Sequence, residues 1–61
     1  MYLSDKMMAA RYSVTREAIW KMSRTVPGFP KPVKVSAGTT RWILAEVEAY
    51  EAKIVEAREN A

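Results

Sequence analysis

Residues 13–24 constrain the fold most, because they combine a helix start, an apolar stripe and a basic outer face. Thr15 is a typical N-cap residue, so the sequence predicts a helix over about residues 15–25. At 3.6-residue spacing, one side of this segment carries the apolar residues Val14, Ala18, Ile19 and Met22. Its other sides carry the basic residues Arg16, Lys21 and Arg24. We therefore expect the apolar side to pack against the rest of the chain and the basic side to face solvent.

A second helix start with the same pattern lies earlier in the chain. Ser4 is the expected N-cap, and Asp5 places an acid in the first turn, where the helix dipole favours it. The sequence thus predicts a helix over about residues 4–12. Both helices have the spacing of a hydrophobic staple, formed by Leu3 with Met8 and by Val14 with Ile19. The link of about two residues suits a sharply angled pair, and Ala9 permits close approach, so we expect a helix-turn-helix.

The turn between these two helices falls at Ser13, where Gly is the commoner choice in a helix-turn-helix. If the backbone turns left-handed there, a residue other than Gly is mildly strained. If it does not, the turn has a different shape. The sequence leaves both alternatives open.

A connector and a β-hairpin follow the second helix. That helix must end before residues 26–28, because Pro27 disfavours helical geometry in the residue before it. The connector over residues 27–32 is expected to place Phe29 in the core. The pattern of residues 33–43 predicts a hairpin, with Gly38 accommodating its turn. Its expected core-facing residues are Val33, Val35, Thr40 and Trp42. Its expected outward-facing residues are Lys34 and Arg41.

The last part of the chain returns to a helical pattern, which predicts a helix over about residues 45–58. Its apolar stripe consists of Val47, Tyr50, Ile54 and Ala57. Ala45 stands where a capping Ser would be expected, which leaves the start of this helix open. Together the elements predict a mainly α fold in a single domain over residues 1–61. This fold is a winged helix-turn-helix of three helices, with a small two-stranded β-hairpin wing between the second and third helices.

Charge and composition limit the functions open to a chain of 61 residues. Residues 1–43 carry eight basic and two acidic side chains, and residues 44–61 carry two basic and five acidic ones. Only the first part therefore favours a polyanion. The absence of Cys and His leaves no support for a disulfide, a metal site or His-based catalysis. No apolar run is long enough to span a membrane. We expect a cytoplasmic protein without enzyme activity, cofactor or small-molecule ligand.

A helix-turn-helix can place the N-terminal part of its second helix in the major groove of duplex DNA. Arg16 and Glu17 would then reach base edges. Lys21 and Arg24 would reach bases or phosphates. Thr15 could contact a phosphate, although its role as a plain N-cap is favoured. The hairpin would lie on the DNA backbone or in an adjacent minor groove. The candidate DNA-binding residues are Thr15, Arg16, Glu17, Lys21, Arg24, Lys34, Thr39 and Arg41.

Several runs spread along the chain form a recognisable set. They are Tyr-Leu-Ser-Asp at 2–5, Val-Thr-Arg at 14–16, Ile-Trp-Lys at 19–21, Phe-Pro-Lys-Pro-Val-Lys at 29–34, Arg-Trp at 41–42 and Glu-Val-Glu-Ala-Tyr at 46–50. In these runs, over about residues 2–52, the chain resembles the AlpA family of prophage regulatory proteins. The run at 29–34, followed by Arg-Trp and an acidic helix, is the most distinctive part. The positions that depart from the family pattern are Ser13, Met22 and Ala45.

The resemblance implies a small winged-helix-like fold related to MerR-type DNA-binding domains and to phage excisionases. It also implies a transcriptional regulator, or a DNA-binding factor that promotes excision, for an integrated phage or a genomic island. The partner would be double-stranded DNA, bound by a homodimer or by a cooperative assembly.

Two other hypotheses stay open. Within the DNA-binding class, the chain could be an excisionase-type factor that bends DNA. In another class, it could be a protein-interaction module that binds a partner through its C-terminal helix, using Val55 and the stripe of Val47 and Ile54. The surroundings of Trp20 are also open: packing beneath the connector is favoured over exposure beside DNA, since an exposed Trp is unusual without a partner.

Overall fold

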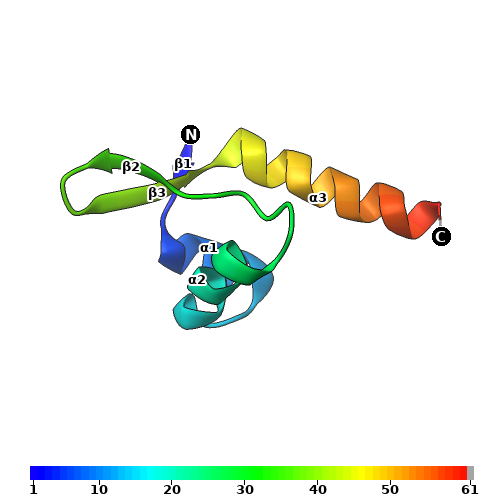
Figure 1. Cartoon of the computed structure of the whole chain (residues 1–61), viewed down its shortest axis with the longest axis horizontal. Coiled ribbons are helices and arrows are strands. Elements are labelled where there is room, and N and C mark those ends of the chain that lie inside the picture. The colour runs from blue at the N-terminus through cyan, green and yellow to red at the C-terminus, as the bar shows by residue number, and fades with distance from the viewer. Residues whose placement is uncertain (61) are drawn as a thin grey trace.

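The computed structural model describes residues 1–60 and has six elements (Figure 1). In chain order they are β1 (Tyr2–Leu3), α1 (Asp5–Tyr12), α2 (Arg16–Thr25), β2 (Val33–Ser36), β3 (Thr39–Ile43) and α3 (Leu44–Glu59). The fold is mainly helical, with three helices and an antiparallel hairpin between α2 and α3. The predicted fold class is therefore confirmed.

The first two helices begin at the caps that the sequence predicts. The Ser4 hydroxyl accepts a hydrogen bond from the backbone N–H of Met7, at 3.1 Å. The Thr15 hydroxyl accepts one from the backbone N–H of Ala18, also at 3.1 Å. Between the helices, Ser13 is left-handed, with φ 56° and ψ 44°. Of the two alternatives for this turn, the left-handed and mildly strained one is correct.

The hairpin belongs to a three-stranded sheet with strand order β1-β3-β2. No strand was predicted from the sequence at Tyr2 and Leu3. These two residues pair antiparallel with β3, where Leu3 lies opposite Trp42. A two-residue strand carries no alternating pattern of its own, so only its partner defines it.

The register of the hairpin corrects the predicted orientation of its valines. Val33 pairs with Arg41, and Lys34 pairs with Thr40. Since side chains alternate between the two faces of a strand, Val33 and Arg41 lie on the face opposite to Trp42. The pairing is irregular between Lys34 and Ser36, which marks a bulge at Val35. The Val35 side chain is 50% exposed. The prediction that Val33 and Val35 face the core is therefore wrong, because a bulge shifts the alternation.

The core lies between the helix pair and the inner face of the sheet. Its buried apolar residues are Leu3, Met8, Ala9, Ile19, Phe29, Trp42 and Val47. Phe29 packs edge-on against Tyr50, with ring centroids 5.1 Å apart, so the predicted role of Phe29 is confirmed. Val14, by contrast, is 40% exposed, which contradicts its predicted place on the apolar stripe. It follows the left-handed Ser13, and its backbone N–H is bonded to Ala9 rather than held in a helix.

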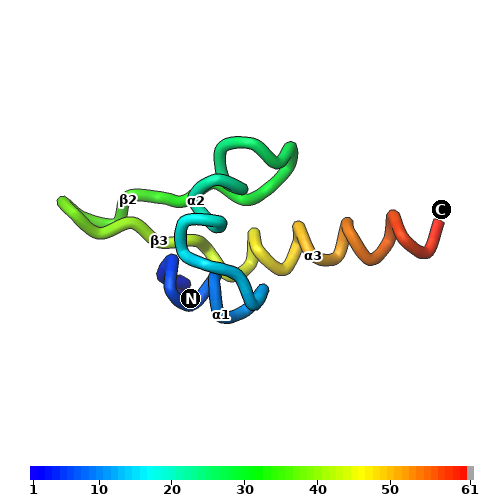
Figure 2. Tube along the Cα trace, turned by 90° about the horizontal axis from the view of Figure 1, so that it is seen from below, coloured from blue at the N-terminus to red at the C-terminus, as the bar shows by residue number. Residues whose placement is uncertain are grey.

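The third helix packs through its first half only. It begins at Leu44, after Ile43, and has no side-chain cap. Val47 is fully buried and Tyr50 packs against Phe29, but Ile54 is 50% exposed and Ala57 is also exposed. The predicted stripe therefore reaches the core through its first two residues and not through its last two. Figures 1 and 2 both show α3 extending to one side of the molecule and the hairpin to the other. The molecule accordingly measures 42 × 21 × 19 Å along its principal axes.

A polar cluster joins α1 to the middle of α3. Two guanidinium nitrogens of Arg11 donate hydrogen bonds to the Glu51 carboxylate, each at 2.6 Å. The Tyr12 hydroxyl donates to the same carboxylate. The Arg11 guanidinium holds the pKa of Glu51 down to about 2. Burial, with the nearby carboxylate, raises the pKa of Tyr12 to about 12. This cluster, which the sequence analysis did not predict, fixes α3 against the helix pair.

Candidate nucleic-acid interface

The outer face of α2 carries three of the candidate residues together. Glu17, Lys21 and Arg24 follow one another at positions i, i+4 and i+7, so they share one face of the helix. All three are exposed, whereas Ile19 and Ser23 on the opposite side are buried. Packing of the apolar side thus turns the basic residues outward, as the pattern predicts.

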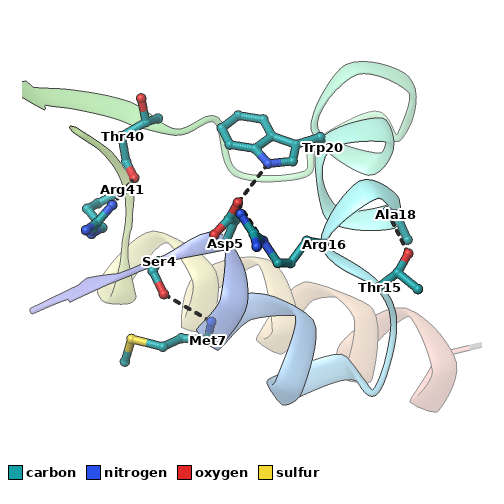
Figure 3. Close-up of polar contacts among 9 residues, drawn as sticks. All are labelled: Ser4, Asp5, Met7, Thr15, Arg16, Ala18, Trp20, Thr40 and Arg41. Carbon is teal, nitrogen blue, oxygen red and sulfur yellow. Dashed lines mark hydrogen bonds and ion pairs between the residues drawn. The ribbon is translucent and has the colours of Figure 1, made fainter. Parts of the chain in front are cut away.

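Thr15 lies at the start of this face and serves as the N-cap of α2. Its hydroxyl oxygen accepts the hydrogen bond from Ala18, which satisfies a backbone N–H that the helix itself leaves free (Figure 3). The favoured interpretation of Thr15 as a cap is therefore confirmed. The hydroxyl hydrogen has no acceptor among residues 1–60, so the cap leaves it free to donate to a phosphate.

Arg16 is held by a carboxylate that the sequence analysis treated only as a dipole partner. Its Nε lies 3.3 Å from Oδ2 of Asp5. The indole N–H of Trp20 donates to the same oxygen, at 3.1 Å (Figure 3). The Trp20 hydrogen bond, followed by the charge and hydrogen bond of Arg16, lowers the pKa of Asp5. Asp5 therefore stays ionised at neutral pH and joins α1 to α2.

Trp20 is partly buried and packs against the core, as the favoured prediction has it. Its ring is tilted by 58° against that of Trp42, with centroids 5.0 Å apart. Trp42 is fully buried and donates its indole N–H to the carbonyl of Pro30, at 3.1 Å. The ring of Trp42 and the carboxylate of Asp5 thus hold Trp20 against the core.

The C-terminal end of α2 is held by Lys31, which the sequence analysis did not single out. Its ammonium group donates to the backbone carbonyl of Ser23. A cation is favoured at this end of a helix, where carbonyl groups lack helical partners. The hydroxyl of the buried Ser23 is bonded in turn to the carbonyl of Ile19. Lys31 therefore links the connector to α2 and helps to fix the angle at which the helix lies.

The structure separates the three candidate residues of the hairpin onto two faces. Arg41 and Thr39 share one face of β3, because side chains two positions apart point the same way. Lys34 pairs with Thr40 and so lies on the other face. Arg41 is half-buried and donates to the carbonyl of Thr40, at 2.8 Å, while Lys34 is exposed. One flat surface therefore cannot contact Lys34 and Arg41 through the same side of the hairpin.

Several basic side chains of the described residues make no ion pair. Within residues 1–60, the ion pairs are those of Arg11 with Glu51 and of Arg16 with Asp5. The basic candidates outside these pairs are Lys21, Arg24, Lys34 and Arg41. The same part of the chain has no group of acidic residues that could hold a metal ion. Its helices are also too short or too polar to cross a membrane.

Comparisons with protein-family models, with curated proteins and with solved structures found no match for this chain.

Proposed function

We propose that this chain is a sequence-specific, double-stranded DNA-binding transcriptional regulator of a prophage or genomic island. It acts in the cytoplasm as a binding protein and not as an enzyme. In this proposal α2 binds in the major groove, and the β2–β3 hairpin binds the DNA backbone or an adjacent minor groove. A second copy binds an adjacent site, since one module of this size has a small contact area.

The observation that carries the proposal is the outer face of α2. Lys21 and Arg24 are exposed there, and within residues 1–60 they make no ion pair. Cations without a protein partner can neutralise phosphates and release the ions bound to DNA. Arg and Lys also match the acceptor atoms of guanine in the major groove, and Glu17 can accept a hydrogen bond from cytosine. The same face thus supplies both affinity and base recognition.

The resemblance to the AlpA family supports the biological part of the proposal. The motifs of the resemblance lie on the elements described above: the caps of α1 and α2, the connector, β3 and the start of α3. The link to a prophage or genomic island rests on this resemblance alone. Integrase or phage genes beside the coding sequence would support it, and their absence would count against it.

Selection from random DNA tests the binding function. Wild-type protein is mixed with a pool of random duplexes, and the recovered duplex is titrated by fluorescence anisotropy at several salt concentrations. We expect a defined sequence to be enriched. We also expect log K to fall with log salt at a slope of about −4 to −5, since about four to six phosphates are neutralised. Binding of no duplex at low salt would contradict the proposal.

A specific observation also favours a second function, in which α3 binds a protein partner. The exposed half of α3 carries Ile54 and Val55, which are 50% and 43% exposed. Beside them is an open groove of about 250 Å³, lined by Pro27, Gly28, Tyr50, Lys53, Ile54 and Ala57. If the anisotropy titration shows no DNA binding at low salt, this interaction function replaces the first proposal.

A further inference from the structure

We infer that Asp5 is a positioning residue that holds Arg16 ready to recognise a guanine. The Asp5 carboxylate accepts a hydrogen bond from Nε of Arg16. The two terminal amino groups of the guanidinium are then available to donate to the DNA. Two amino groups in one plane match the O6 and N7 acceptors of guanine. This inference rests on the proposed function, because it assigns a base-reading role within the same interface.

The geometry of Arg16 fits such a role. Its side chain is 64% exposed, whereas that of Asp5 is 22% exposed. The contact between them joins Nε of Arg16 to Oδ2 of Asp5. Within residues 1–60, neither terminal amino group of Arg16 donates a hydrogen bond. The guanidinium is therefore fixed through its Nε, and its two terminal amino groups have no partner among the described residues.

The carboxylate that fixes Arg16 is itself fixed from the core. Oδ2 of Asp5 also accepts the indole N–H of Trp20, and Trp20 packs against the fully buried Trp42. Trp42 is bonded in turn to the carbonyl of Pro30. Asp5 also lies in the first turn of α1, where the helix dipole favours an acid. A continuous path of packed and hydrogen-bonded groups thus runs from the core to Arg16. Figure 3 shows its outer part, from Trp20 through Asp5 to Arg16.

The pairing of Arg16 with Asp5 acts differently on the preference for one base and on the affinity for DNA of any sequence. A free arginine is attracted to any phosphate, but one paired with a carboxylate carries little net charge. Fixing the side chain before binding lowers the entropy that a base contact costs. Asp5 therefore weakens binding to random DNA and strengthens the preference for the correct base. A purely structural Asp5 would affect both kinds of binding in the same direction.

The test uses Asp5→Asn, which keeps the shape of the side chain and an acceptor for Trp20 but removes the charge. The probes are the duplex selected by the wild-type protein, the same duplex with each guanine pair changed in turn, and a random duplex. We expect discrimination at one guanine pair to fall about tenfold, as for the loss of a bidentate contact. Affinity for the random duplex should rise about twofold, because a negative charge is removed.

The Arg16→Ala background separates positioning from a role in folding. If Asp5 acts through Arg16, Asp5→Asn causes no further loss of discrimination when Arg16 is already absent. Asp5→Glu serves as a second variant, because it keeps an acid in the first turn of α1 while moving the carboxylate. It should fold like the wild type and still discriminate less. Thermal unfolding of each variant verifies that it is folded.

The outcomes distinguish this inference from the function on which it rests. If the wild type selects a duplex but Asp5→Asn and Asp5→Glu discriminate as well as the wild type, the positioning role of Asp5 is overturned. The same holds if Asp5→Asn weakens binding to all duplexes equally, or reduces discrimination by the same factor in the Arg16→Ala background. If the wild type binds no duplex at all, the proposed function fails first and this inference fails with it.

Discussion

Ser13 sets the angle between α1 and α2, and it does so in left-handed geometry. For residues with a Cβ atom, this conformation costs about 1–2 kcal/mol relative to the right-handed one. This geometry is needed because the chain must reverse between two helices that pack on the same core. The backbone N–H of Ser13 is bonded to the last turn of α1, and that of Val14 to Ala9, so the turn is held by backbone hydrogen bonds.

The first prediction concerns this residue. Ser13→Gly should raise the free energy of unfolding by about 0.5–1 kcal/mol, because Gly adopts positive φ without a steric cost. Ser13→Ala is the matched control, since it removes the hydroxyl and keeps the strain. Chemical denaturation of the two variants and the wild type measures the effect. A Gly variant no more stable than the Ala variant would show that the turn is not strained.

Roles that depend on near neighbours were predictable from the sequence, whereas the specific partner of a side chain far along the chain was not. The caps at Ser4 and Thr15 depend on neighbours three residues away, so a short pattern contains all the information needed. Asp5 depends on Trp20, which is 15 residues away. Only the folded chain brings these two side chains together. Arg16 was therefore identifiable as a candidate from the sequence, but the carboxylate that holds it was not.

At the scale of elements, α3 is held by a few contacts near its start and by the cluster around Glu51. Val47 is fully buried at one end of this contact region, and Ile54 lies half exposed beyond it. Both residues belong to the one apolar stripe that the sequence predicts. The stripe predicts which side of the helix is apolar, but it does not predict how far along the helix the partner extends.

The second prediction compares these two residues. Val47→Ala should lower the free energy of unfolding by about 2 kcal/mol, because it removes two buried methyl groups from a packed core. Ile54→Ala should lower it by less than about 1 kcal/mol, since that side chain is already half in water. Denaturant unfolding of the two variants measures the difference. Equal losses would mean that the outer half of α3 is packed.

The third prediction concerns the cluster that joins α1 to α3. The pKa of Glu51 lies near 2 in the folded chain, below its ordinary value of 4.5. A carboxylate with a lowered pKa stabilises the fold above pH 4.5 and loses that contribution as the pH falls towards 2. Glu51→Gln should therefore lower the midpoint of thermal unfolding at pH 7 by about 5 °C. The difference from the wild type should shrink between about pH 4.5 and pH 2.

Glu48→Gln is the control for this pH dependence. Glu48 is an exposed acid on the same helix, and within residues 1–60 it makes no ion pair. This variant should unfold like the wild type across the whole range. A constant difference between Glu51→Gln and the wild type at every pH would contradict the account of the cluster.

In the sheet, the hairpin was predictable from the sequence, but the exact pairing of its strands was not. The hairpin and its Gly38 turn follow from alternation and turn chemistry, and Gly38 has the expected positive φ, 76°. The bulge at Val35 and the added strand β1 do not follow, because both depend on which residue of β3 lies opposite which partner. A shift of one residue moves every later side chain to the other face, so the orientation of the valines was predicted wrongly.

At the scale of the whole molecule, charge is divided unevenly between the two parts of the chain. The segment with the helix pair and the hairpin has a large basic excess, and the segment with α3 has an acidic excess. The hairpin and the end of α3 lie on opposite sides of the body (Figure 2). The acidic excess of α3 lies in its first half, at Glu46, Glu48 and Glu51, whereas residues 52–59 carry two basic and two acidic side chains. A polyanion is therefore attracted mainly to the part of the molecule formed by the helix pair and the hairpin.

The central claim, that the outer face of α2 binds duplex DNA, is tested most directly by the salt dependence of matched double variants. Lys21→Gln with Arg24→Gln removes two cations from α2, and Lys53→Gln with Arg58→Gln removes two from α3. Each protein is titrated by anisotropy against the duplex selected with the wild type. The α2 variant should bind more weakly, with a salt slope reduced by about two, while the α3 variant keeps the wild-type slope. Equal slopes for the two double variants would contradict the claim.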